Sequence, residues 1–509
     1  MQMWTLSWPV MMSNLLHALV PVVDTIMVGR LGPDAIAAIG LGNVLRMFLF
    51  ILVLSVAVGS LSLISQAKGA RNPRRMSEVT KQSLISGFFI ALILGLFGLI
   101  VARPLLDLMD SSNNSNLINA AYDYLVIIFL GAPFLLLNFV ADRLMQGAGD
   151  TKTPLILTAF MVILNIGLNY VFIFGVGDLE GLGIKGAAVG TVLARALTFA
   201  VSFYLFHSGR NVVQIIKGSW KPNYELIKDL FTIGLPSGIQ GIFRRGSNLL
   251  LVSVLTATEL GGLGAAVLAI GWQIETLIAH IVVGANVAGT SIVGQELGKW
   301  QVSTAYSKGN FMIVFGFMLG LTLVIPAIVL CDEIIYLFDP SVNPTILSGT
   351  RSFVYIVLAS LPLASISIMI SGTMRGSGDT KPAMMSTFWF RTVLTIFLAY
   401  VFVFVLNFNS ISVWIAMILG RVLDVGYMIW KWIQRDWVHI AIEKTEVFRT
   451  HLRYLSEERL RLFLSDVRSM EMAKPDTVEI VNEEGVIYRR GSTDIFVKLD
   501  DGYEGEQVI

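Results

Sequence analysis

The sequence has few charged residues and few of the residue types that form disulfides or metal sites. Asp, Glu, Lys and Arg make up 14% of the 509 residues, against about 25% in soluble proteins. The single cysteine, Cys331, excludes an intramolecular disulfide, and the five histidines show no metal-binding spacing. The net charge of +1 offers no basic field for nucleic acid, so we expect no nucleic-acid partner.

Apolar residues are abundant instead. They make up 55% of the chain, and the mean hydropathy is +0.71. A soluble core cannot bury that much apolar surface, so the lipid bilayer must solvate much of it. Runs long enough to span a bilayer predict an all-α integral membrane protein with twelve transmembrane helices, at 4–28, 36–66, 82–101, 119–146, 155–177, 186–207, 227–256, 266–294, 311–331, 347–374, 383–406 and 411–433.

The distribution of Lys and Arg predicts the orientation of these spans. Most of them lie in the even-numbered connections, whereas the odd-numbered ones hold only Arg30, Arg103, Lys185 and Arg351. Because basic residues are enriched in cytoplasmic loops, we expect the even connections and both termini to be cytoplasmic in a multi-pass protein of the cell membrane.

The two halves of the sequence repeat. The segment Met145–Lys152 (MQGAGDTK) recurs as Met374–Lys381 (MRGSGDTK). Three further residues repeat at the same spacing: Gln66, Gly69 and Pro133 recur as Gln295, Gly298 and Pro362. Each half holds six expected spans, so the repeats are parallel and predict two pseudo-symmetric six-helix bundles. Rocking of two such bundles opens a path to either side of the membrane, which favours a transporter.

The repeated Gly-x-Gly-Asp-Thr-Lys loop has a structural interpretation. It lacks the GxxxxGK[ST] spacing of a phosphate loop, and no strand precedes it. We expect glycine to end one helix, Asp150 or Thr151 to cap the next, and Lys152 to lie inside it. No ATP-driven motor is predicted.

These motifs resemble the MATE (multidrug and toxic compound extrusion) transporters, in particular their archaeal and bacterial branch. Val23–Gly32 (VDTIMVGRLG), the Gln66-x-x-Gly69 ending and the doubled loop carry the resemblance over about residues 1–434. The resemblance implies antiport of small organic, often cationic, compounds against Na⁺ or H⁺ by a monomer that needs no cofactor and is not an enzyme.

Asp24 is the main candidate for the coupling residue. A charged side chain in mid-bilayer costs about 2.5–3.5 kcal/mol on insertion scales, so such residues usually face the protein interior and function there. An interfacial pair with Arg30 is the structural alternative. By the resemblance, Asp24 holds a proton or ligates Na⁺, and Pro9 matches a proline at which the family's first helix bends. Pro21, three residues before Asp24, is a second candidate bend.

Asn165 and Asn169 lie four residues apart, so they share one face of the fifth span. Together with Asp24 they offer oxygen ligands, which hard cations such as Na⁺ prefer. Hydrogen bonding between helices is the structural alternative. The family commonly has Asp where Asn169 stands, so a two-acid proton mechanism does not carry over simply. Tyr124 and Asn138 fall near the family's remaining cavity positions.

Glu275 is the candidate in the second half, inside the eighth span. Some branches of the family bind the coupling ion through acids there, but they also use an Asp on the tenth span, which this sequence lacks. The structural alternative is a partner for Arg244 or Arg245.

The composition changes after about Asp436. We therefore expect a first lobe at 1–208, a cytoplasmic linker at 209–226, a second lobe at 227–436 and a cytoplasmic extension at 437–509. In the extension, helical spacing over 437–470 precedes three alternating segments typical of strands: Thr477–Val481, Val486–Tyr488 and Ile495–Leu499. A membrane-surface helix and a partner-binding module both remain open.

Two other functions are compatible with parts of the pattern. A flippase for lipid-linked oligosaccharides or precursors shares the architecture, but it needs several cationic residues for a pyrophosphate, and Arg46, Arg244 and Arg245 are the available ones. A channel or receptor is the other class, which the duplicated halves and the intramembrane Asp24 disfavour.

Overall fold

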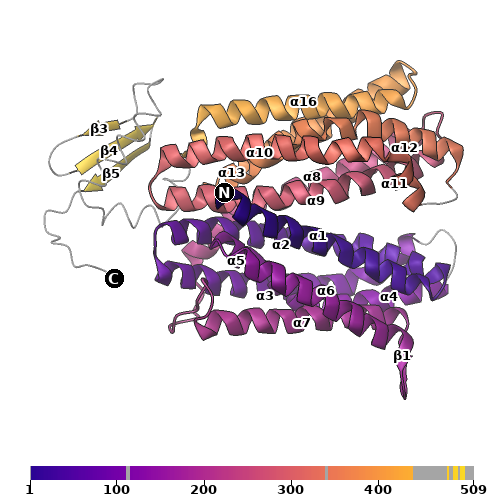
Figure 1. Ribbon diagram of the computed structural model, residues 1–509, viewed down its shortest axis with the longest axis horizontal. Coiled ribbons are helices and arrows are strands. Elements are labelled where there is room, and N and C mark those ends of the chain that lie inside the picture. The colour runs from indigo at the N-terminus through magenta and orange to yellow at the C-terminus, as the bar shows by residue number, and fades with distance from the viewer. Residues whose placement is uncertain are drawn as a thin grey trace.

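The computed structural model describes residues 2–109, 115–338, 342–438, 478–480, 485–490 and 493–498. Its long helices run side by side in two layers, one from each half of the chain (Figure 1). The first half contributes α1 (Gln2–Gly29), α2 (Pro33–Gly69), α3 (Pro73–Met109), α4 (Ser115–Leu130), α5 (Ala132–Gly147), α6 (Lys152–Phe174) and α7 (Ile184–Ser208).

The second half repeats this order with more interruptions. Its helices are α8 (Tyr224–Thr256), α9 (Leu263–Gly298), α10 (Val302–Val329), α11 (Cys331–Phe338), α12 (Pro344–Ile356), α13 (Leu361–Gly376), α14 (Lys381–Ser386), α15 (Thr395–Tyr400) and α16 (Ile411–Gln434). A 3-10 turn, η1 (Leu358–Ser360), separates α12 from α13, and the π-helical segments η2 (Thr387–Leu394) and η3 (Val401–Val405) flank α15.

These helices form twelve candidate spans, six in each half. In the described part of the chain, nine helices are long and apolar enough to cross a membrane, and the α4–α5 pair, bent by 53°, makes a tenth. The remaining two are α2 and α8, with 37 and 33 residues. A helix rises 1.5 Å per residue, so each is long enough for the hydrocarbon core of about 30 Å.

The repeated prolines lie at the same break in each half. Pro133 occupies the first turn of α5, directly after the bend from α4, and Pro362 occupies the first turn of α13, directly after η1. Proline has no backbone N–H to donate, so it fits the first turn of a helix without the loss of a hydrogen bond, whereas further inside a helix it removes one. The repeat therefore encodes one interrupted span in each lobe.

The repeated loops form helix ends, as the sequence predicted. Gly149 and Gly378 both adopt φ +86°, which few residues other than glycine tolerate. The Asp150 Oδ1 accepts a hydrogen bond from the Thr153 backbone N–H at 3.1 Å, so Asp150 supplies the cap and Lys152 begins α6.

The repeated Gln and Gly residues hold the two lobes together. A Cβ on Gly69 would lie 2.0 Å from the Gln295 carbonyl oxygen, and one on Gly298 would lie 2.1 Å from that of Gln66. The side-chain amides complete the symmetry, because Gln66 Nε2 donates to the Gly376 carbonyl (2.8 Å) and Gln295 Nε2 donates to that of Gly147 (3.1 Å). The C-terminal ends of α2 and α9 thus cross in close contact, and each helix places its glycine against the glutamine of the other.

Five short strands complete the described structure. A hairpin of β1 (Gly175–Val176) and β2 (Leu179–Glu180) joins α6 to α7. In the C-terminal extension, β3 (Val478–Ile480), β4 (Gly485–Arg490) and β5 (Thr493–Lys498) pair antiparallel, which confirms the three predicted strands. The predicted helix over 437–470 lies almost entirely outside the described residues.

Candidate coupling site

Asp24 lies in the interior of the first lobe, on the face of α1 that packs against α6. Its exposed fraction is 4%, and its Oδ1 accepts a hydrogen bond from Asn169 Nδ2 at 2.6 Å. Asn165, one turn earlier on α6, donates from Nδ2 to the Asn169 Oδ1 at 3.4 Å and to the Thr191 hydroxyl of α7 at 3.3 Å. The structure therefore brings together Asp24, Asn165 and Asn169, and adds Thr191.

A glycine on α7 allows this arrangement. A Cβ on Gly190 would lie 2.2 Å from Asn169 Oδ1, so only glycine leaves room for the amide between the two helices. Gly190 precedes Thr191 directly, and the close approach of α6 and α7 therefore also brings the threonine hydroxyl to Asn165.

The donor set fits a small hard cation. Asn165 Oδ1 is buried and has no hydrogen-bond partner in the described structure, and the Asp24 carboxylate and the Thr191 hydroxyl supply further oxygen atoms. Hard cations prefer such ligands. No group of three or more His, Cys, Asp or Glu side chains gathers in the described part of the chain. The ligand atoms that this site offers to a cation are carboxylate, amide and hydroxyl oxygens.

A second polar group, which sequence reasoning missed, lies on the same face of α1. His17 Nε2 is 3.3 Å from both Asp142 Oδ2 on α5 and Thr158 Oγ1 on α6, and Thr158 also bonds to Ser13 at 3.0 Å. Ser13, His17 and Asp24 are spaced by four and seven residues, which places them on one helix face. That spacing inside an apolar run was the signal that could have revealed the group.

Tyr124 and Asn138 are both buried, but they occupy different surroundings. The ring of Tyr124 packs on α2, where a Cβ on Gly42 would lie 2.9 Å from it. Asn138 makes no hydrogen bond to the Asp24 group in the described structure, and its Nδ2 has no partner there. Asn138 is therefore not brought into the cluster.

Pro9 and Pro21 lie inside one continuous helix, α1. The carbonyl of Pro21 accepts the Thr25 hydroxyl at 2.8 Å. Bending of α1 at either proline remains a prediction.

Glu275 on α9 forms an ion pair with Arg421 of α16 at 2.5 Å. Arg421 also donates to the Val357 carbonyl (2.9 Å) and the Ser360 hydroxyl (3.0 Å), at the break before α13. The ion pair of Glu275 is therefore with Arg421, and Arg244, one of the two partners that the structural alternative named, lies within electrostatic range of the carboxylate. The pair lies in the second lobe, apart from Asp24.

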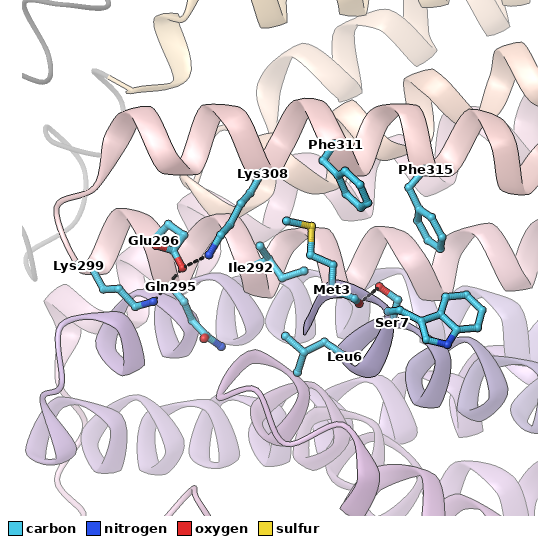
Figure 2. A pocket seen from close by; sticks show the side chains of 11 residues that line it. Met3, Leu6, Ser7, Ile292, Gln295, Glu296, Lys299, Lys308, Phe311 and Phe315 are labelled. Carbon is cyan, nitrogen blue, oxygen red and sulfur yellow. Dashed lines mark hydrogen bonds and ion pairs between the residues drawn. The ribbon is translucent and has the colours of Figure 1, made fainter. Parts of the chain in front are cut away.

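A further pocket opens between the start of α1 and the helices α9 and α10, with a volume of about 330 Å³ (Figure 2). At its polar end, Glu296 Oε1 accepts from Lys299 (2.8 Å) and Lys308 (2.7 Å). Phe311 and Phe315 form its apolar side. None of the predicted site residues lines it.

Comparisons with known proteins agree with this architecture. The MatE family model matches residues 9–171 and 245–401, one segment in each half. A relative from Thermotoga maritima, named as a probable multidrug resistance protein NorM, is 26% identical over 81% of this chain and 88% of its own.

Two solved structures are also similar. A MOP superfamily transporter from Pyrococcus furiosus, described by a reverse polarity of its binding pocket that suggests a different function, superposes with a TM-score of 0.78, 27% identity and coverage of 86% of this chain and 96% of its own. A MATE transporter in complex with MaL6 superposes with a TM-score of 0.79 and is 25% identical, with the same coverage of both chains.

The chain belongs to the MatE family. It is thus a multi-pass membrane transporter of twelve helices in two bundles and not an enzyme, and the family it belongs to is coupled to ion gradients and needs no cofactor.

Proposed function

We propose that this protein is a secondary active efflux transporter, which exchanges small organic compounds for Na⁺ or H⁺ by alternating access. The observation that carries the proposal is the buried Asp24 carboxylate, bonded to a neutral amide inside one of two duplicated bundles. A buried carboxylate inside a membrane-spanning bundle is the kind of group that takes up a proton or a metal ion.

The residues around Asp24 have separable roles in this mechanism. Asn169 donates to the carboxylate and so fixes its orientation. Asn165 and Thr191 hold the amide in place and present oxygen atoms on the same side. Na⁺ would be held by these oxygens, whereas H⁺ would neutralise Asp24 and weaken its hydrogen bond to Asn169. Either event changes the packing of α1 against α6.

The reciprocal Gln66 and Gln295 contacts supply the other half of the mechanism. They join the lobes at the helix ends followed by the basic connections, which we assign to the cytoplasm together with both termini. Opening toward that side requires these bonds to break, so we assign the structure to a state closed there. A single chain contains both lobes, and we propose that it acts as a monomer in the cell membrane.

Purified protein in proteoliposomes tests the proposal. Efflux of a fluorescent dye is measured with a Na⁺ gradient alone at equal pH, and then with a pH gradient alone without Na⁺. We expect one gradient to drive accumulation against the dye's concentration gradient. Equal rates with and without both gradients, at the level of a passive pore, contradict the proposal.

A flippase for lipid-linked precursors is the second candidate, and cationic side chains favour it. Arg244 and Arg245 on α8 are both solvent-accessible, whereas the side chain of Arg46 lies outside the described part. The multidrug resistance name of the Thermotoga relative supports efflux of organic compounds, which the sequence resemblance expects to be often cationic. The charge of the substrate depends on the side chains that line its path.

A further inference from the structure

Three arginines from both lobes gather where the lobes meet. Arg143 lies on α5, Arg244 on α8 and Arg375 on α13. Arg375 Nη2 donates to Gln240 Oε1 at 3.0 Å, and Gln240 lies one turn before Arg244 on the same face of α8. Arg375 is also within electrostatic range of both Arg244 and Arg143.

The reciprocal lobe contact fixes where this cluster lies. Arg375 directly precedes Gly376, whose carbonyl accepts from Gln66. Arg143 lies one turn before Gly147, whose carbonyl accepts from Gln295. The two arginines therefore flank the pseudo-symmetric crossing, and Arg244 faces them from α8.

None of the three has an ion-pair partner among the described residues. Arg143 donates only to neutral amide oxygens, of Gln146 at 2.8 Å and Asn14 at 3.3 Å. The Arg375 Nε is buried without a hydrogen-bond partner.

Two carboxylates lie within electrostatic range of these arginines but form their close contacts with other residues. Asp142, beside Arg143, already has a histidine partner, and Glu275, near Arg244, is bonded to Arg421.

The surroundings add positive charge. Arg245 and Arg391 are within electrostatic range of Arg244. The Arg143 side chain is buried, whereas Arg244 is accessible to solvent although protein surrounds it densely. Unpaired cations of this kind repel one another, and proteins usually retain buried charges that are paired or that mark a substrate pathway.

We propose that this arginine cluster binds an anionic oxygen group, a carboxylate or a phosphate, of the transported compound. Guanidinium groups match such groups geometrically and bind them through charge-assisted hydrogen bonds. The substrate is then an organic anion rather than the cation that the family resemblance implies. An anion held by Arg143 from one lobe and by Arg244 and Arg375 from the other bridges the surfaces that separate during rocking. The inference rests on the proposed transport function.

Two dyes with the same xanthene core but opposite charge test the inference. Fluorescein is an anion and rhodamine 123 a cation at neutral pH. Binding to the purified full-length protein is measured by fluorescence anisotropy for the wild type, Arg244→Gln, Arg375→Gln and the control Arg210→Gln, which removes an exposed charge in the loop after α7.

We expect the wild type and the control to bind fluorescein more tightly than rhodamine 123. Each cluster variant should weaken fluorescein binding by about tenfold, as loss of one charge-assisted hydrogen bond predicts, and leave rhodamine 123 unchanged or tighter. Size-exclusion profiles identify any variant that does not fold. Because Arg244 is accessible to solvent, Arg244→Gln should disturb the fold less than Arg375→Gln does.

Transport in proteoliposomes separates the two proposals. Gradient-driven movement of fluorescein that Arg244→Gln reduces supports both. Movement of rhodamine 123 alone, unaffected by Arg244→Gln, retains the transport function and overturns the anion site. Arginine-dependent fluorescein binding without gradient-driven movement of either dye retains the site and overturns the transport function. A second probe covers anions that are part of a lipid: movement of NBD-labelled phosphatidate between leaflets is followed by dithionite quenching. The inference is overturned if the wild type neither binds fluorescein nor moves this lipid in an Arg244-dependent way.

Discussion

Each lobe holds an acidic side chain within a helix, buried in the case of Asp24 and partly buried in the case of Glu275. In the first lobe, Asp24 bonds to the neutral amide of Asn169. In the second, Glu275 bonds to the guanidinium of Arg421, which is itself anchored at the break before α13. An arginine inside the protein neutralises the Glu275 carboxylate, whereas the Asp24 carboxylate lies beside the amide and hydroxyl oxygens that we propose as ligands of the coupling ion. Burial alone therefore does not identify a coupling residue, and the side chains packed around each carboxylate have to be compared.

The largest expected effect comes from removing the Asp24 charge. Asp24→Asn should reduce ion-driven efflux from proteoliposomes to the level of protein-free liposomes, because an amide neither takes up a proton nor offers a charged ligand. The isosteric change keeps the packing, so the melting temperature should change little. Full ion-driven activity in this variant would refute Asp24 as the coupling residue.

The matched change in the second lobe should affect stability instead. Glu275→Gln leaves Arg421, whose side chain is only 4% exposed, without its ion-pair partner. Breaking a buried pair in this way costs about 3 kcal/mol. We expect a clearly lower melting temperature and retained ion coupling in the protein that remains folded. Loss of ion coupling without loss of stability would show that Glu275, like Asp24, is a coupling residue.

A smaller effect is expected from the glycine that seats Asn169. Gly190→Ala places a methyl group 2.2 Å from Asn169 Oδ1, which must shift the amide away from Asp24. Overpacking of this kind costs about 1–3 kcal/mol, so the ion concentration for half-maximal transport should rise by about tenfold. Gly167→Ala on α6, where the added Cβ meets nothing within 4 Å, is the control and should leave it unchanged.

The smallest effect concerns a carboxylate outside the spans, between α8 and α9. Partial burial raises the pKa of Glu259, but hydrogen bonds from the Ser410 hydroxyl and backbone N–H outweigh it, so the pKa lies below its usual range. A carboxyl whose pKa is lowered on folding stabilises the fold above its unfolded-state pKa and loses that contribution as the pH falls through its folded-state pKa.

The wild type should therefore lose thermal stability on acidification in part through this group, and Glu259→Gln should show a slightly flatter loss. Identical pH profiles of the melting temperature for the two proteins would exclude a contribution of Glu259 to the pH dependence of stability.

The relation between sequence and site is clearest at particular residues. Asn165 and Asn169 were predictable as a pair because helical spacing places them on one face, and Asp24 because a charge is rare in an apolar run. His17 was overlooked although its spacing from Asp24 carries the same information. Thr191 and Gly190 were not predictable, since they come from a different helix and hydropathy reports nothing about which helices touch. The ion pair of Glu275 with Arg421 was missed for the same reason: Arg421 is distant in sequence, whereas the candidates chosen were the arginines of the preceding span, of which Arg244 lies within electrostatic range.

The sequence by itself determined the membrane environment, the number of spans and the duplication, because these depend on hydropathy and on local motifs that act within one helix or turn. It also determined where helices end, through the paired glycines and prolines. Only the tertiary structure decided which polar groups meet: the amide beside Asp24, the guanidinium beside Glu275 and the unpaired arginines between the lobes. Such contacts depend on helix packing over distances of several turns, and the same side chain is a site or a structural support according to the charge that packing places against it.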